Sequence, residues 1–399
     1  MSIEFQRTNA SAGLPTPIWR TGFRPFFFGA AILACVGVLS WIGKLHGAPF
    51  PNSRFSGSDW HSHEMVFGYT LAVVAGFLLT AVRHWSGGRE TARGGRLAAI
   101  FALWIAGRLT GAFSAVLPWW MPAIFDLAFP VAVAIVIARP LHAARRLGDL
   151  GFAAWLTVMG VLSAVAHGLA ARGVEGGPGR ISTLGVAITL LLIVIIAGRI
   201  IPNFTRFHLK AEGIRSFPAL DWAAILAVGA MPVLSLARAE KWVGAMAFVA
   251  AAANLLRLYF WKPWRAAPSP MLLVLHIAYL WLPIGFFLRG WFALVGGGTP
   301  SSATHALTVG ALGTLTLGMM GWVGLAHTGR PVKSSPAMLF AYAAITVAAV
   351  IRVAGPMVTP AHYIDLLGWS GALWSAAFAA YLIGYSRALI SPAAKGGTD

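Results

Sequence analysis

The amino-acid sequence predicts an all-α membrane protein, a polytopic helical bundle of about twelve transmembrane helices with both termini in the cytoplasm. Of its 399 residues, 58% are hydrophobic and only 11% are Asp, Glu, Lys or Arg, whereas soluble domains are about a quarter charged. The 17 Trp and 24 Phe suit lipid-facing and interfacial surfaces, where aromatic rings concentrate. The connections between apolar runs are short, so residues 1–399 are expected to form a single transmembrane domain.

A transmembrane helix needs roughly twenty mainly apolar residues, and twelve stretches of the chain meet this requirement. The predicted spans are 25–45, 61–83, 97–117, 119–138, 149–170, 181–201, 219–238, 241–263, 270–296, 303–326, 337–358 and 364–387. The third and fourth spans are divided at Leu117-Pro118-Trp119-Trp120, where a proline and two tryptophans are typical of a tight interfacial turn.

The positive charges of alternate loops predict the orientation of the bundle. One set of loops carries most of the cations that lie between spans, namely Arg83, Arg89, Arg93, Arg96, Arg139, Arg145, Arg146, Arg206, Lys210, Arg215, Lys262, Arg265, Arg330 and Lys333. These loops are expected to be cytoplasmic. They account for much of the net charge of +18, and no basic polar face is long enough to dock a nucleic-acid backbone, so nucleic acid is not an expected partner. The first twenty residues lack the apolar core of a cleavable signal, so the first span is expected to insert uncleaved.

The composition limits which side chains can hold a metal. Cys35 is the single cysteine and lies in an apolar run, where a small core residue is expected. A metal would therefore be held by His, carboxylate or Met side chains rather than by thiolates. Ionisable groups at membrane depth are costly and usually mark a function, so the histidines of the spans are the first candidates.

The second span opens at the outer face with Asp59-Trp60-His61-Ser62-His63-Glu64-Met65. Residues two apart on a helix point about 200° away from each other, so His61 and His63 are not expected to share one metal. Residues three apart share a face, so His61 and Glu64 can. One histidine is therefore predicted to face one centre and the other a second. The alternative is that both histidines cap the helix or lie among the lipid headgroups.

The tenth span also opens at the outer face with a histidine, His305. Two histidines on different spans at one level are what a b-type heme needs, because its iron takes an imidazole on either side. We therefore predict that His63 and His305 bind heme b, with His61 and Glu64 in a metal site nearby. The candidates for metal ligation are His61, His63, Glu64, His276, His305 and His327.

Four other charged residues lie within spans. Arg289 and Arg352, in the outer halves of their spans, can pair with heme propionates, and the alternative for each is a buried pair with Asp365 or a carbonyl. Arg108 and Asp126 lie near mid-depth on adjacent spans and are predicted to be each other's partner.

A second group of histidines is predicted towards the cytoplasm. His276 is the deepest and is the preferred ligand of a second centre. His327 closes the tenth span before Thr328-Gly329-Arg330, which also fits a helix C-terminus followed by a glycine turn. His84 is expected at the interface. Positions in loops or at the interface are also expected for His46, His142, His167, His208 and His362. Several glycines of the tenth span would let a neighbouring helix or a flat ring approach: Gly310, Gly313, Gly318 and Gly321.

Several stretches together resemble the NnrS family of bacterial membrane proteins. They are Phe23-Arg24-Pro25-Phe26, Trp60-His61-Ser62-His63-Glu64-Met65, Gly76-Phe77-Leu78-Leu79-Thr80-Ala81-Val82, Gly198-Arg199, Pro202-Asn203-Phe204-Thr205, His276 with Tyr279, His305 through Gly310, and His327-Thr328-Gly329-Arg330. They keep their order over residues 23–330. Two positions depart from the family pattern: Arg83-His84 replaces a Pro-Asn pair, and Met320-Gly321-Trp322 lacks an Arg expected before the His-Thr-Gly-Arg motif.

The resemblance implies a heme- and copper-containing protein of the bacterial inner membrane that is tied to the nitric oxide response in denitrifying and related bacteria. Its expected partners are nitric oxide or iron–nitrosyl species, the lipid bilayer and an electron donor that the sequence does not identify. It would act as an oxidoreductase on nitric oxide or relieve nitrosative stress, with no catalytic residue assigned. A weaker similarity is to heme–copper oxidases and nitric oxide reductases, which also have twelve spans and heme histidines on spans two and ten. Their copper-site histidine motifs are missing here, so oxygen reduction is not expected.

The sequence also allows a different class of function, a transporter or a metal- or heme-handling accessory protein that uses the same histidines as pathway groups. Transporters usually show repeat symmetry and helices broken near mid-membrane. No convincing repeat is visible in the sequence, which favours the heme and copper protein.

Overall fold

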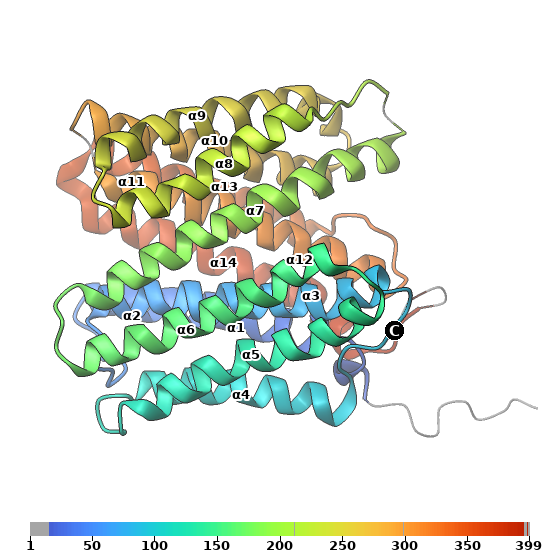
Figure 1. Ribbon diagram of the computed structural model, residues 1–399, viewed down its shortest axis with the longest axis horizontal. Coiled ribbons are helices and arrows are strands. Elements are labelled where there is room, and N and C mark those ends of the chain that lie inside the picture. The colour runs from blue at the N-terminus through green and yellow to red at the C-terminus, as the bar shows by residue number, and fades with distance from the viewer. Residues whose placement is uncertain (1–15, 211, 298, 395–396, 398–399) are drawn as a thin grey trace, which may run out of the picture.

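The structure, a computed structural model, describes residues 16–210, 212–297, 299–394 and 397. Over these residues it contains helices and turns but no strand, which confirms the predicted all-α fold. The long helices lie roughly side by side along the longest axis of the molecule (Figure 1). Ten of them are continuous: α1 (Phe23–Leu45), α4 (Gly94–Ala112), α5 (Trp120–Ala143), α6 (Gly151–Ala171), α7 (Gly177–Leu209), α8 (Pro218–Leu236), α9 (Glu240–Phe260), α10 (Pro270–Leu294), α13 (Pro336–Val358) and α14 (Tyr363–Ile390).

Two further spans are each built from three consecutive segments. The first comprises α2 (Gly57–His63), η2 (Glu64–Thr70) and α3 (Leu71–Trp85), and the second comprises α11 (Pro300–His305), η5 (Ala306–Gly313) and α12 (Thr314–His327). Short 3-10 turns lie at Pro17–Trp19, Leu147–Leu150, Pro263–Ala266 and Pro360–His362.

The helices overlie the twelve stretches predicted from hydropathy. Over the described residues, 11 spans are long and apolar enough to cross a membrane, and α4, which carries Arg96 and Arg108, is the helix that does not meet this measure. The largest difference in a boundary is at α7, which continues to Leu209 rather than ending near residue 201. The chain is a multi-pass membrane protein.

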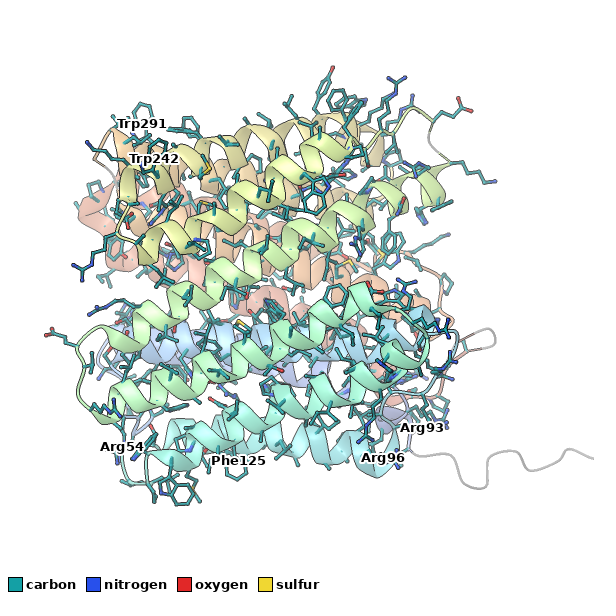
Figure 2. The ribbon with its side chains drawn as sticks, viewed as in Figure 1. Arg54, Arg93, Arg96, Phe125, Trp242 and Trp291 are labelled. Carbon is teal, nitrogen blue, oxygen red and sulfur yellow. The ribbon has the colours of Figure 1, made fainter. Side chains whose placement is uncertain are left out.

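Both described ends of the chain lie at the same end of the bundle. The buried Arg24, near the start of α1, donates hydrogen bonds to the carbonyls of Leu389 at 2.6 Å and Ser391 at 2.8 Å, at the end of α14. A cation is favourable at a helix C-terminus, where carbonyls lack partners within the helix. Arg93 and Arg96 lie at this same end, and Trp242, Trp291 and Arg54 at the other (Figure 2). Following the predicted orientation, we call the two ends inner and outer.

The two segmented spans share a local construction. In each, α-helical bonding changes to π-helical bonding directly after a histidine, His63 or His305. Thr70 Oγ1 donates to the carbonyl of Met65 at 2.8 Å, and Thr314 Oγ1 lies 3.4 Å from that of Val309, in both cases five residues back. Such π-helical turns are uncommon and often lie at functional sites. The two π-helical segments therefore point to the outer halves of these spans as candidate positions for a functional site.

These two spans meet inside the bundle. Tyr69 and Thr316 are joined by a hydrogen bond of 2.6 Å between their hydroxyls. The span Gly57–Trp85 is the most enclosed of the membrane-crossing helices, whereas α8 is the most open to lipid. Glycine permits the close packing: a Cβ on Gly310 would lie 2.5 Å from the Trp281 ring. The histidines of the predicted centres are thus carried by interior helices.

Candidate functional site

His61 and His63 face opposite sides of α2, as their spacing predicts. The His61 ring stacks on Trp41 of α1 with 5.6 Å between ring centroids. The His63 ring is fully buried on the other side, where its Nε2 lies 2.9 Å from Ser163 Oγ of α6. The two histidines therefore belong to two separate environments.

His61 lines a cavity of about 330 Å³ at the outer end of the bundle. Its walls come from α1, α2, η2, α7, α11, η5, α13 and α14, and they are mainly apolar, including Val38, Ile42, Met65, Leu312, Leu367 and Trp374. Small-molecule sites commonly have volumes of about 300–1,000 Å³ and a few convergent polar groups on apolar walls. The polar groups here are His61, His305, Arg352 and several hydroxyls.

His305 and Arg352 are held in place around this cavity. The Nδ1 of His305 donates to the Ser301 carbonyl at 2.7 Å, which leaves Nε2 of the neutral ring as the nitrogen with a free lone pair. Arg352 donates from Nη2 to Ser301 Oγ at 2.7 Å, and its guanidinium lies over the Tyr363 ring. The Nη1 of Arg352 is buried and has no hydrogen-bond partner among the described residues.

The structure does not bring together the pair predicted for heme, His63 and His305. His63 does not line the cavity, and His61 is the histidine that shares it with His305. Arg289 also lies elsewhere: it forms an ion pair of 3.3 Å with Glu240 of α9, and both side chains are partly exposed. Of the two arginines predicted to meet propionates, Arg352 lines the cavity.

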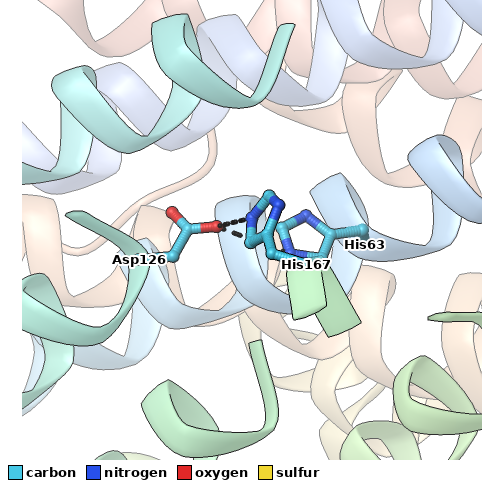
Figure 3. Close-up of side chains that lie close together, drawn as sticks. All are labelled: His63, Asp126 and His167. Carbon is cyan, nitrogen blue, oxygen red and sulfur yellow. Dashed lines mark hydrogen bonds and ion pairs between the residues drawn. The ribbon is translucent and has the colours of Figure 1, made fainter. Parts of the chain in front are cut away.

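His63 instead belongs to a buried cluster with Asp126 of α5 and His167 of α6 (Figure 3). The Nε2 atoms of His167 and His63 lie 3.0 Å and 3.4 Å from Asp126 Oδ2. Ser163 Oγ donates to the same oxygen at 3.0 Å. One atom from each of His63, Asp126 and His167 falls within 4.8 Å of the others, and all three residues are buried.

Arg108 of α4 lies beside this cluster and binds two carboxylates. It forms an ion pair with Asp126, as predicted, through Nη2 and Oδ1. Its Nη1 forms a second ion pair with Glu64 Oε2 at 2.7 Å. Glu64 therefore faces Arg108, away from the cavity that His61 lines, so the predicted site of His61 with Glu64 is not assembled.

His167 is the residue that the sequence interpretation missed. Its place close to the end of a span suggested an interfacial residue, but only 3% of its surface is exposed. It lies one turn after Ser163 on α6 and at the outer level of His63 and Asp126. A search for ionisable residues at one depth on neighbouring spans would have found it.

The remaining predicted histidines lie apart from both sites. His276 is buried on α10, with Nε2 2.9 Å from Thr205 Oγ1 of α7. Among the described residues, no group of three metal-ligating side chains includes it. His84 and His327 meet at the inner end, with 3.3 Å between Nε2 and Nδ1.

A further buried polar network involves Gly198 and Tyr279 of the predicted motifs. Arg257 of α9 forms an ion pair with Asp221 at 2.8 Å and donates to Tyr279 Oη at 2.7 Å. A Cβ at Gly198 would overlap the Arg257 guanidinium, so glycine at this position lets the guanidinium approach α7, where it donates to the Val194 carbonyl at 3.2 Å. This network fixes α7, α9 and α10 to one another and contains no histidine.

The comparison with known families agrees with these motifs. The family model described as NnrS protein matches residues 17–393, nearly the whole chain. A search of curated proteins found no match. The matched region contains the cavity, the buried cluster and all the long helices, and the chain belongs to the NnrS protein family.

Proposed function

We propose that the chain is a heme- and copper-binding protein of the bacterial inner membrane that acts in nitric oxide metabolism or in protection from nitrosative stress. One observation carries the proposal: His61 and His305, on different spans, line the same apolar cavity at the outer end of the bundle. Membership of the NnrS family and the nitric oxide response that the sequence resemblance implies supply the substrate class.

The residues around the cavity suit a heme. An apolar macrocycle needs apolar walls between helices and an imidazole for its iron. The aromatic and aliphatic residues around the cavity supply the apolar walls, and His61 and His305 supply the imidazoles. Arg352 adds a buried guanidinium with one unpartnered nitrogen, Nη1, which suits a propionate carboxylate.

The two histidines are not held equally. The hydrogen bond from His305 Nδ1 to the Ser301 carbonyl fixes the ring and makes Nε2 the ligating atom, as second-shell partners do at metal sites. The Nδ1 of His61 is buried and has no partner among the described residues. With a bound heme, His305 would therefore be the more rigidly held imidazole and His61 the less constrained one.

This difference fits chemistry with nitric oxide. A bound heme would supply an iron that can bind nitric oxide. The His61 ring, which stacks on Trp41 and has no hydrogen bond at Nδ1 among the described residues, could move aside for a small ligand more readily than His305, which the Ser301 carbonyl anchors.

The direct test is the optical spectrum of the purified protein, with and without nitric oxide. We expect a Soret band that shifts when nitric oxide is added to the reduced protein and that is largely lost in His305→Ala. His362→Ala is the matched control, because that histidine lies at the outer end with 71% of its side chain exposed. Wild-type protein produced with ample heme and yet lacking a Soret band would refute the proposal.

The same purified protein distinguishes the alternative, a transporter or a metal- or heme-handling accessory protein. Such a protein, reconstituted in vesicles, would move metal, heme or a small anion across the bilayer without retaining a heme. Net uptake together with an empty optical spectrum would favour this alternative.

A further inference from the structure

We infer that His63, Asp126 and His167 form a site for a first-row transition-metal ion that prefers imidazole, with Cu²⁺ bound more tightly than Zn²⁺. The inference rests on the proposed function for the presence of copper and names the residues that would hold it. The donor set of two imidazole nitrogens and one carboxylate oxygen suits these ions, and affinity generally rises towards Cu²⁺ in the first row.

Two of the three distances between the donors are close to those between metal ligands, and all three donors fall within 4.8 Å of one another. Tetrahedral ligands about 2.0–2.2 Å from an ion lie roughly 3.3–3.6 Å from one another. The two imidazole nitrogens lie 3.0 Å and 3.4 Å from Asp126 Oδ2, so small movements would admit an ion. Ser163 Oγ lies beside the donors, 2.9 Å from His63 Nε2 and 3.0 Å from Asp126 Oδ2.

The charges around the cluster also favour a cation. Asp126 and Glu64 are 4% and 2% exposed. In the described ion pairs with arginine, the single guanidinium of Arg108 binds both carboxylates. One negative charge is then unmatched unless a cation binds or an imidazole is protonated. A buried charge without a partner is costly. A metal ion would supply the missing positive charge.

The neighbouring groups orient the donors. Arg108 binds Asp126 Oδ1, so Oδ2 is the oxygen that faces the two imidazoles and the Ser163 hydroxyl. Glu64 Oε1 lies 3.5 Å from His63 Nδ1, and neither atom has a hydrogen-bond partner among the described residues. If His63 ligates through Nε2, its proton is on Nδ1 and faces Glu64, the carboxylate–histidine–metal arrangement common at metal sites.

The competing explanation is a hydrogen-bonded network in which an imidazolium replaces the metal. Both explanations use the same residues, so mutation and stability alone cannot separate them. Metal stoichiometry and the spectrum of the bound ion can, because an imidazolium network binds no ion.

The test uses full-length protein in detergent, freed of metal by a chelator and titrated with Cu²⁺. We expect one tightly bound equivalent whose electron paramagnetic resonance spectrum shows coupling to two imidazole nitrogens. His167→Ala should weaken this binding at least tenfold. His84→Ala is the matched control, because it disrupts the contact between His84 and His327 at the inner end, and it should leave the binding unchanged.

Two further measurements keep the result interpretable. His167→Gln, which retains a hydrogen-bonding side chain, replaces His167→Ala if the latter does not fold. The Soret band of the His167 variants should match wild type, since His167 does not line the cavity. Wild-type protein that binds no more Cu²⁺ than His167→Ala, or copper without nitrogen coupling, would overturn the inference, while an absent Soret band would instead count against the proposed heme.

Discussion

His61 and His63 are two positions apart on α2, yet one lines the outer cavity while the other contacts Asp126 on the opposite side of the helix. The proposed heme and metal sites therefore lie on opposite sides of the same helical turn. Changes at either histidine should affect one site and spare the other, and the predictions below use this separation.

Arg352→Leu should reduce the fraction of purified protein that retains heme by severalfold. The change removes the buried guanidinium of the cavity and its hydrogen bond to Ser301. The heme-to-protein ratio, measured by the pyridine hemochrome assay, reports the effect. Arg289→Leu is the matched control, because that arginine pairs with Glu240 outside the cavity, and equal losses in both variants would contradict the assignment.

Arg108→Leu should destabilise the protein by about 3–5 kcal/mol, since removing one partner of a buried ion pair leaves uncompensated charge. Here two carboxylates, Glu64 and Asp126, lose their guanidinium at once. Unfolding in mild detergent followed by circular dichroism measures the change. Arg146→Leu, which breaks a more exposed pair with Asp149, should cost about 1 kcal/mol or less.

Adding Glu64→Gln and Asp126→Asn to Arg108→Leu should restore part of the lost stability, because no buried charge then remains in the network. If the triple variant is less stable than Arg108→Leu alone, the unfavourable charge is not the cause of the loss.

Gly107→Ala should disturb the Arg108 network although it changes no charge. A Cβ at Gly107 would overlap Asp126 Oδ1, whereas one at Gly95 on the same helix would meet nothing within 4 Å. We expect Gly107→Ala to lower both thermal stability and Cu²⁺ affinity, and Gly95→Ala to change neither. Equal behaviour of the two variants would show that Asp126 is not fixed as described.

Phe55→Ala should speed the exchange of metal at the buried cluster severalfold. The Phe55 ring lies 4.7 Å from the His63 ring and 4.8 Å from the His167 ring, between centroids, and it closes the cluster towards the outer end. Stopped-flow removal of Cu²⁺ by a chelator measures the rate. Phe50→Ala, which contacts Trp60 instead, should leave the rate near that of wild type.

Much of the fold follows from hydropathy, because a run of apolar residues has few other solutions in a bilayer. The opposite directions of His61 and His63 follow equally from helix geometry. Which of them shares a cavity with His305 depends on how α2 is rotated against α1 and α6, and side-chain packing sets that rotation. The prediction paired His63 with His305 because the sequence gives depth along a span but not its rotation.

The π-helical segments after His63 and His305 are a second reason why helical periodicity alone does not predict the directions of the side chains in these two spans. The extra residue in such a turn rotates all later side chains relative to an α-helix, so a helical pattern cannot be carried through Glu64–Thr70 unchanged. Arg289 shows a further limit: its depth was compatible with a propionate, but Glu240 at the start of α9 lies within reach and binds it.

The most direct test of the central claim is the coordination state of the heme in His61→Ala compared with His63→Ala, by resonance Raman and electron paramagnetic resonance. If heme binds in the cavity as proposed, His61→Ala should remove one of its two histidine ligands and retain His305, whereas His63→Ala should leave the heme signals as in wild type. Loss of an axial ligand in His63→Ala, with His61→Ala unchanged, would contradict the account.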